Sequence, residues 1–183
     1  MIEHNGKHYA RVTEVLQGLC DFSHIDPWVL KNKCRIGTNV HKAIEDDFRG
    51  DFPILREDEA GYYESYERWA AEIKPRVLRS EERYYDSSKM LCGQIDAVLD
   101  LGWTDLPVLV DFKTSAQESK QVWPLQAHLY AYLLAQNGLL VGPSYQFIKL
   151  DKLGALPQVF TYMWNQNTHA FCMGLVDKFW LTQ

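Results

Sequence analysis

The chain has 183 residues, of which 46% are hydrophobic and 23% are charged, and its formal net charge is −5. No apolar run approaches the roughly 20 residues that a membrane-spanning helix needs, and the N-terminus lacks the apolar core of a signal peptide, so we expect a cytoplasmic protein that binds no membrane. The negative charge counts against a large phosphate-binding face, although carboxylates that hold a metal ion add negative charge that the ion offsets.

Neither a repeat nor a Gly/Ser linker interrupts the sequence, which predicts one domain over residues 1–183. We expect the part up to about residue 75 to be helical, and residues 76–183 to hold a sheet and further helices. The four cysteines form no C-x-x-C pair, which indicates reduced, packed thiols and not a zinc site.

Three helices are predicted in the first part of the chain. Asp26 and Pro27 are typical of an N-cap and a first helical position, so a helix begins there. A second helix begins near Thr38 and ends at Gly50, because the apolar residues between them recur at helical spacing. A third covers about residues 57–74 and ends before a proline, which cannot continue a helix.

The second part of the chain alternates between strand and helix patterns. A strongly apolar segment predicts a buried helix over 122–136, and a last helix covers about 168–181. The predicted strands are 77–86, 91–101, 108–113, 144–152 and 157–164. This order predicts an α/β fold with a mixed β-sheet of about five strands, flanked by helices on both faces.

Two of these strands carry charged residues within apolar sequence. Asp96 lies in GQIDAVLD, and Asp111 and Lys113 lie in VLVDFKTS. If the strands form a hairpin, the aspartates converge at one end, and Asp111 and Lys113 project from the same face. Mg²⁺ prefers carboxylate oxygens together with phosphate and water, and a lysine beside them orients a water or neutralises a phosphate. Considered alone, these two strands are equally compatible with a buried Asp–Lys ion pair.

Four motifs occur in order along residues 37–130, about half of the chain. They are Gly37-Thr38-Asn39-Val40-His41 followed by Glu45, Gly93-Gln94-Ile95-Asp96, Asp111-Phe112-Lys113 followed by Thr114, and Gln126-Ala127-His128-Leu129-Tyr130. Together these motifs resemble the RecB-like branch of the PD-(D/E)XK nucleases, which includes phage exonucleases and helicase-linked nuclease domains. The resemblance implies a restriction-endonuclease-like core.

The resemblance implies a metal site for Mg²⁺ or Mn²⁺, with one or two ions. Asp96 and Asp111 would be ligands, and the backbone carbonyl of Phe112 a further one. His41 would complete the metal shell as a neutral imidazole, which suits Mn²⁺ better than Mg²⁺; its alternative role is a helix histidine capped by a neighbour. Glu45, one helical turn after His41, would orient that imidazole or hold a second metal's water, or it is solvated.

By the same resemblance, Lys113 would position the attacking water. Gln126 and Tyr130 lie one turn apart on one helix face and would touch the nucleic acid or the catalytic residues, although Tyr130 also fits a core position. Thr114 and Ser115, directly after the D-x-K motif, would contact the nucleic acid.

A glutamate shortly before G-x-x-D is common in this branch, and Glu82 occupies that place. It adjoins Glu81, and a strand exposes only one of two neighbouring residues on a given face. By this resemblance we expect a catalytic role for Glu82, although its neighbour Glu81 competes for the same position.

Some aromatic residues are candidates for stacking on unpaired bases. We expect most of the tryptophans and tyrosines to be core residues. Phe22, Trp28, Tyr62 and Tyr63 are the candidate positions for an exposed stacking surface.

Taken together, the motifs predict a metal-dependent deoxyribonuclease, and we expect an exonuclease that processes single-stranded or duplex DNA ends in recombination, repair or phage replication. The alternatives are a structure-specific endonuclease and a non-catalytic nucleic-acid-binding module that retains the fold. A glycosidase built on paired carboxylates would leave Lys113 without a role. Some RecB-like nucleases carry an iron–sulfur cluster on one cysteine before the histidine motif and three near the C-terminus. Because only Cys172 lies near the end of this sequence, the resemblance implies no such cluster here. A bacterial or phage setting, a homo-oligomer and a recombination or replication partner protein are all compatible with this prediction.

Overall fold

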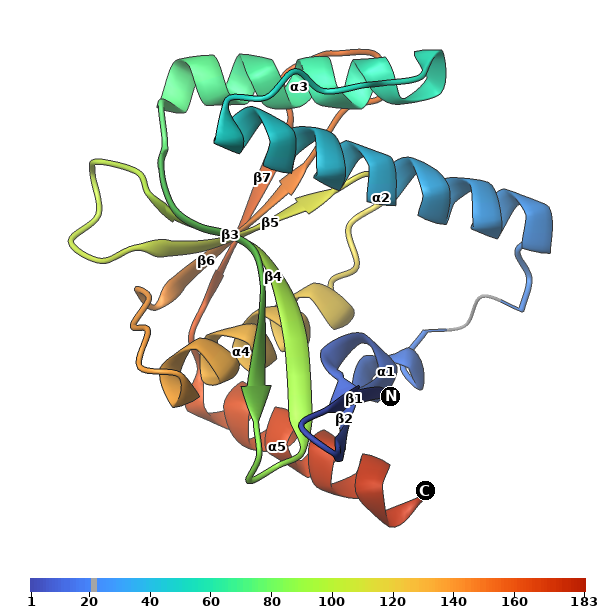
Figure 1. Ribbon diagram of the computed structural model, residues 1–183, viewed down its shortest axis with the longest axis vertical. Coiled ribbons are helices and arrows are strands. Elements are labelled where there is room, and N and C mark those ends of the chain that lie inside the picture. Colours follow the sequence, from blue (N-terminus) through green and yellow to red (C-terminus); the bar gives the residue numbers. More distant parts are fainter. Residues whose placement is uncertain (21–22) are drawn as a thin grey trace.

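A computed structural model describes residues 1–20 and 23–183 of the chain (Figure 1). Within these residues, seven strands form one sheet and five helices surround it. The strands are β1 (Ile2–His4), β2 (Lys7–Arg11), β3 (Arg76–Asp86), β4 (Leu91–Asp100), β5 (Val108–Lys113), β6 (Ser144–Lys149) and β7 (Gln158–Met163). The helices are α1 (Val12–Gln17), α2 (Pro27–Arg49), α3 (Glu57–Ile73), α4 (Val122–Gln136) and α5 (Gln166–Leu181).

The sheet is mixed and runs in the order β1-β2-β4-β5-β6-β7, with β3 paired to β4. Two pairs are parallel, β2 with β4 and β5 with β6, and the others are antiparallel. Helix α4 makes the crossover between β5 and β6, as a connection between parallel strands requires. The α/β fold with a mixed sheet is therefore confirmed.

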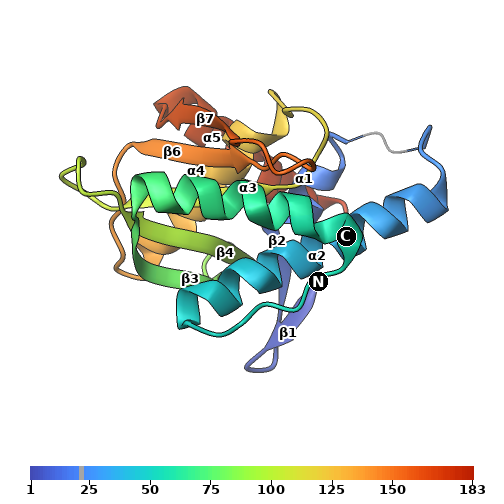
Figure 2. The ribbon, with the colours of Figure 1, turned by 90° about the horizontal axis from the view of Figure 1, so that it is seen from above.

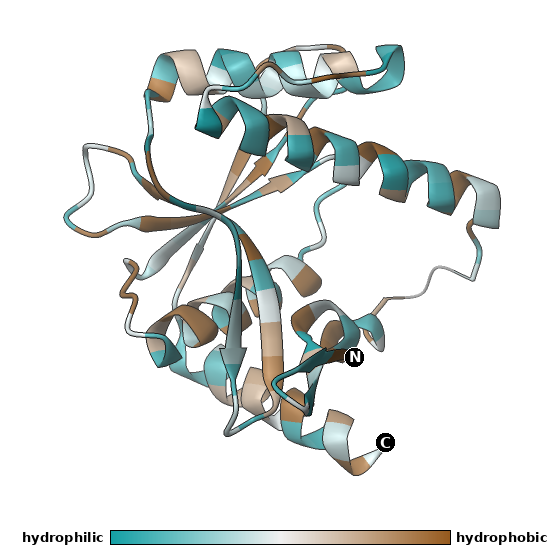
Figure 3. Cartoon of the chain, in the orientation of Figure 1, coloured by the Kyte–Doolittle hydropathy of each residue, from teal (hydrophilic) through white to brown (hydrophobic). Residues whose placement is uncertain are grey.

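The helices form two layers, one on each face of the sheet (Figures 1 and 2). Helices α2 and α3 run side by side over one face and bury Val40, Tyr66 and Trp69 against Phe112 of the sheet. Helices α1, α4 and α5 cover the other face, where Leu129 belongs to a second core cluster. Figure 3 shows that hydropathy follows these layers: α2 is largely hydrophilic, whereas hydrophobic residues gather in the strands and on α4. Within the described ranges, no helix is both long enough and apolar enough to cross a membrane.

A buried ion pair fixes α2 against α3. Arg35 of α2 donates to the carboxylate of Glu59, which is only 1% exposed. Asn39, one turn further along α2, donates to the same carboxylate at 2.7 Å. The second oxygen of Glu59 accepts from the backbone nitrogen of Arg56 and so caps α3. The two helices therefore share one charged junction.

Helix α2 differs from the prediction of two helices divided before Thr38. It runs unbroken for 23 residues from the N-cap Asp26 to Gly50, whose φ of 79° ends it. Gly37 lies inside it, where a Cβ atom would be 3.3 Å from Oγ1 of Thr114. Glycine at this position thus leaves room for the side chain of Thr114, and it does not end the helix.

The N-terminal strands β1 and β2 were not among the predicted elements, and they raise the number of strands from about five to seven. Asn5 and Gly6 form the turn between them with φ angles of 50° and 71°. Asn-Gly is a strong signal for a two-residue hairpin turn, so the sequence did contain the information. The other predicted strands and helices agree with the structure to within a few residues.

Candidate active site

Asp96 and Asp111 meet where β4 and β5 separate. The pairing of these strands ends at Ala97 and Val110, so Asp96 and Asp111 occupy the next opposed positions. Oδ2 of Asp96 accepts a hydrogen bond from the backbone nitrogen of Phe112 at 2.8 Å, across the gap between the strands. The structure thus brings together the two aspartates of the G-x-x-D and D-x-K motifs.

Helix α2 contributes His41 to the same place. Its Nε2 lies 2.8 Å from the carbonyl oxygen of Phe112, which only accepts hydrogen bonds, so Nε2 carries the hydrogen. Nδ1 then faces Oδ1 of Asp96 at 3.4 Å and Oε1 of Glu81 at 3.6 Å. Burial opposes a charged imidazole, but the Asp96 carboxylate outweighs it and raises the pKa of His41 well above its ordinary value. One nitrogen and two carboxylates therefore converge on one point.

This trio contains Glu81 and not Glu82, which corrects the prediction. Atoms of His41, Glu81 and Asp96 that can ligate a metal all lie within 4.8 Å of one another. The side chain of Glu82 instead accepts from Tyr84 and pairs with Arg79. The reason is register: the pairs Ser80–Ala97 and Glu82–Ile95 place Glu81 directly opposite Asp96.

A sequence signal for this register existed in the hairpin turn. Residues 87–90 form a four-residue turn, and Asp86 pairs with Leu91 on either side of it. Counting back from the turn along both strands brings Glu81 opposite Asp96. Glu81 also has a φ of 52°, a conformation uncommon for a residue with a side chain.

Asp111, Lys113, Gln126 and Tyr130 form a hydrogen-bonded chain beside the trio. Nζ of Lys113 lies 2.5 Å from Oδ2 of Asp111 and donates to Oε1 of Gln126 at 3.1 Å. Nε2 of Gln126 donates to Oδ1 of Asp111 and to the Tyr130 hydroxyl, both at 3.1 Å. The Q-x-x-x-Y motif on α4 therefore contacts the D-x-K motif on β5 directly.

The pKa values of Asp96 and Asp111 are shifted in opposite directions. Burial and the neighbouring Asp96 charge raise the pKa of Asp111 to about 7, against the effect of Lys113. Burial also opposes ionisation of Asp96, but His41 outweighs it and lowers the pKa of Asp96. The buried Oδ2 of Asp111 is close to Lys113 but outside hydrogen-bond geometry, and it accepts no hydrogen bond from any residue in 1–20 or 23–183. This oxygen is paired with the Lys113 ammonium group, and the neighbouring carboxylates of Asp96 and Glu81, with Nδ1 of His41, form a donor set that fits a cation.

The other residues with a predicted role lie at varying distances from this centre. Glu45 lines a cavity of about 390 Å³ together with His41, Glu81 and Asp96, and its carboxylate pairs with Lys42. The backbone carbonyl of Phe112 accepts from His41, as above, which leaves it one further lone pair.

Thr114 and Ser115 lie in the segment that follows β5. Thr114 packs against Gly37 of α2, and Ser115 is exposed and donates to the carbonyl of Gln117 at 3.0 Å. Among the described residues, neither side chain forms a hydrogen bond with His41, Glu81 or Asp96.

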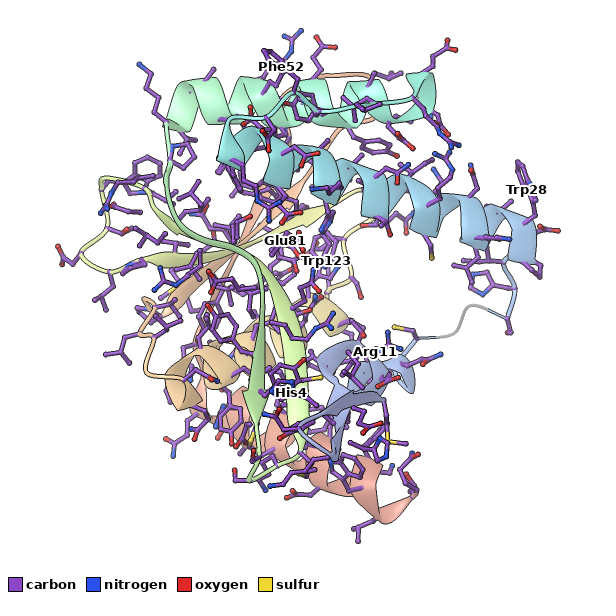
Figure 4. All side chains as sticks on the ribbon, in the orientation of Figure 1. His4, Arg11, Trp28, Phe52, Glu81 and Trp123 are labelled. Carbon is purple, nitrogen blue, oxygen red and sulfur yellow. The ribbon has the colours of Figure 1, made fainter. Side chains whose placement is uncertain are left out.

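Of the aromatic residues, Trp28 is 73% exposed and points away from the body at the outer end of α2 (Figure 4). Tyr62 and Tyr63 are buried to 6% and 7% exposure in the layer between α3 and the sheet, so the prediction that they form a stacking surface is wrong. Phe22 lies outside the described residues.

No protein-family model and no curated protein matches this sequence. Solved structures do match. LHK-Exo, an alkaline exonuclease from Laribacter hongkongensis, has a TM-score of 0.53 at 10% identity, with 95% of this chain and 87% of that chain covered. The crystal structure of LHK-Exo in complex with dAMP gives the same TM-score and coverage at 11% identity. The chain therefore has the α/β fold of the alkaline exonucleases over nearly its full length, which confirms the fold implied by the motifs.

Proposed function

We propose that this chain is a metal-dependent deoxyribonuclease that hydrolyses phosphodiester bonds, and that it acts as an exonuclease on DNA ends. The observation that carries the proposal is the convergence of His41, Glu81 and Asp96 on one point, next to the buried carboxylate of Asp111 and its partner Lys113. The fold shared with an alkaline exonuclease supports the proposal, and so does dAMP, a DNA constituent, in the complex of that enzyme.

The donor set fits a divalent cation such as Mn²⁺ or Mg²⁺. Carboxylate oxygens are hard ligands that suit both ions, and an imidazole nitrogen favours Mn²⁺. Asp96, Glu81, Asp111 and His41 Nδ1 would hold one or two ions, with the bond from His41 Nε2 to the Phe112 carbonyl fixing the ring. When bound, such an ion polarises the phosphate and lowers the pKa of a water molecule.

Lys113 places a positively charged side chain at the cluster, in addition to any bound metal ion. Gln126 accepts from its ammonium group and Asp111 lies beside it, so the charge is held in place at the cluster. There it would orient the attacking water or neutralise charge that develops on the phosphate. The buried Tyr130 hydroxyl has a pKa raised by burial and by the neighbouring carboxylates, so it stays protonated and able to donate.

Under this proposal the substrate is single-stranded or duplex DNA with a free end, and recombination, repair or phage replication is the setting. Hydrolysis would leave a 5′ phosphate. Thr114, Ser115 and the exposed Trp28 are the residues through which we expect a strand to be contacted outside the cluster.

The decisive experiment incubates end-labelled linear DNA, single-stranded and duplex, with Mg²⁺, Mn²⁺ or EDTA. Lys113→Met should abolish cleavage, whereas Lys149→Met should retain it. Lys149 is a matched control, because it pairs with Lys113 in the next strand but donates to the carbonyl of Ala116 outside the cluster.

The pattern of products distinguishes the remaining possibilities. Labelled fragments that shorten from one end, with covalently closed circles left intact, support an exonuclease. Cleavage of closed circles would indicate an endonuclease. DNA binding without cleavage of DNA or RNA under any metal condition would overturn the enzymatic proposal in favour of a binding module.

A further inference from the structure

A second row of hydrogen-bonded polar side chains lies on the paired strands β3 and β4, next to the trio of His41, Glu81 and Asp96. Arg83 pairs directly with Gln94 across the two strands. Glu81 lies two residues before Arg83 and so occupies the position diagonal to Gln94, within reach of a long side chain. Gln94 also lines the same cavity as His41 and Asp96. The hairpin register thus places an arginine, a glutamine and a glutamate in contact.

The hydrogen bonds in this chain have a fixed direction. Nη2 of Arg83 donates to Oε1 of Gln94 at 2.6 Å, and Nε2 of Gln94 donates to Oε2 of Glu81 at 2.6 Å. A guanidinium group can only donate, and an ionised carboxylate can only accept. Arg83 therefore holds the oxygen end of the Gln94 amide, so that its NH₂ group faces Glu81.

Both oxygens of Glu81 then have a defined direction. Oε2 accepts from Gln94, and Oε1 faces Nδ1 of His41 at 3.6 Å. The backbone of Glu81 is in the left-handed conformation, with a φ of 52°, which residues other than glycine and asparagine adopt at a cost. The amide of Gln94 thus restrains a side chain that projects from an unusual backbone geometry.

The same arrangement occurs on the other side of the metal-binding trio. Lys113 donates to Oε1 of Gln126, and Nε2 of Gln126 donates to Oδ1 of Asp111. In each case a cation that can only donate orients a glutamine, and the glutamine donates to a carboxylate of the site. The two chains come from different elements, the β3–β4 hairpin and the β5–α4 pair.

We propose that Gln94, oriented by Arg83, is a positioning residue that presents the Glu81 carboxylate to the metal site. The inference rests on the proposed function, because it assigns Glu81 to the metal that the nuclease would use. It adds Arg83 and Gln94 to the machinery, two exposed residues that touch neither His41 nor Asp111 by any hydrogen bond.

The test measures Mn²⁺ binding by the electron paramagnetic resonance signal of the free ion, in the absence of DNA. Gln94→Met keeps the length of the side chain but removes both hydrogen bonds, and we expect it to weaken Mn²⁺ binding roughly tenfold, as other second-layer ligand supports do. Arg83→Met should weaken it by a smaller factor, about threefold, because the amide remains but can rotate. Arg79→Met is the matched control: it removes the same charge from the same strand, but Arg79 pairs with Glu82.

The double variant Arg83→Met/Gln94→Met separates orientation from simple electrostatics. If Arg83 acts through Gln94, the double variant binds Mn²⁺ as the Gln94→Met variant does; if the two losses multiply, Arg83 acts on its own and the relay is overturned. Thermal unfolding in EDTA should be similar for all variants, since both side chains are exposed.

The two proposals fail in different ways. If the wild-type protein binds no Mn²⁺, the metal-dependent function is overturned and this inference with it. If the wild-type protein binds Mn²⁺ and the Gln94→Met variant binds it equally well, only the positioning role is overturned.

Discussion

Gly93 and Tyr130 fit together so closely that any side chain at position 93 would displace the tyrosine ring. A Cβ atom built on Gly93 would lie 2.8 Å from Cε1 of Tyr130 and 3.0 Å from Cδ1 of Leu133. Carbon atoms in contact normally lie about 3.5–4.0 Å apart, so the ring would have to move. The glycine of the G-x-x-D motif thus makes room for the tyrosine of the Q-x-x-x-Y motif, and Tyr130 in turn accepts from Gln126.

Gly93→Ala should therefore damage both stability and the site. We expect it to lower the free energy of unfolding by about 1–3 kcal/mol, as overpacking of a core does, and to reduce cleavage through displacement of Gln126. Gly174→Ala is the control, because no atom lies within 4 Å of its Cβ and it lies in α5, where alanine stabilises a helix by up to about 1 kcal/mol. Urea unfolding measures the difference, and equal stabilities of the two variants would contradict the packing argument.

Asp111→Asn should abolish the stabilisation that a metal gives. A ligand that binds only the folded protein adds about 2.7 kcal/mol at a hundred times its dissociation constant. We expect the melting temperature of the wild-type protein to rise when Mn²⁺ replaces EDTA, and that of the variant to stay constant. A variant that responds to Mn²⁺ like the wild-type protein would remove Asp111 from the metal site.

Metal affinity should depend on pH because Mn²⁺ competes with a proton on Asp111. The pKa of this carboxyl is raised to about 7, so below that pH the metal must displace the proton. We expect affinity to rise roughly tenfold per pH unit for each displaced proton, and to go on rising above about pH 7 until His41, whose pKa is also raised, has lost its proton. Calorimetry in buffers of different ionisation enthalpy would count the released protons. Proton release that is unchanged in Asp111→Asn would assign the proton to another group.

The same raised pKa has a consequence for the metal-free protein. Because the folded protein binds the Asp111 proton more tightly than the unfolded chain, the contribution of this group to stability is complete below the ordinary pKa of 3.8 and is lost as the pH rises through about 7. The raised pKa of His41 acts in the same direction. In EDTA, the melting temperature should therefore fall between pH 5 and pH 8, and Asp111→Asn should flatten this fall.

Arg35→Ala should separate α2 from α3 at their charged junction. Glu59 is 1% exposed, so loss of its cationic partner leaves a buried charge with neutral donors only. We expect a loss of about 3 kcal/mol in the free energy of unfolding. Arg68→Ala removes an exposed pair with Glu64 and should change stability by less than about 0.5 kcal/mol. Similar losses in the two variants would show that the junction is not a strong contact.

Local sequence signals predicted the elements that hold the site, because each signal is short-range. The alternation in β4 and β5, the apolar run of α4 and the proline after α3 all act within one element. The convergence of Asp96 and Asp111 followed from a single hairpin. The prediction failed where the outcome depended on another part of the chain: a second helix was predicted to begin near Thr38, but α2 is unbroken there, and the contact of the adjacent Gly37 is with Thr114, 77 positions later.

The choice between Glu81 and Glu82 shows the same limit on a smaller scale. Alternation within one strand states that the two face opposite ways, but not which of them faces the site. The pairing of β3 with β4 decides it, and this pairing is set by the turn at residues 87–90. Exposure of the aromatic residues was equally non-local, since Tyr62 and Tyr63 are buried by the sheet beneath α3.

Because α2 is a single unbroken helix, it connects Trp28 at its outer end to His41 in the site. Thirteen residues separate Trp28 at its outer end from His41, a distance of about 20 Å along a rigid helix. The charged junction with α3 lies between these two points, at Arg35 and Asn39. A strand that contacts Trp28 would therefore touch the same rigid helix that carries the imidazole of His41 on the other side of this junction.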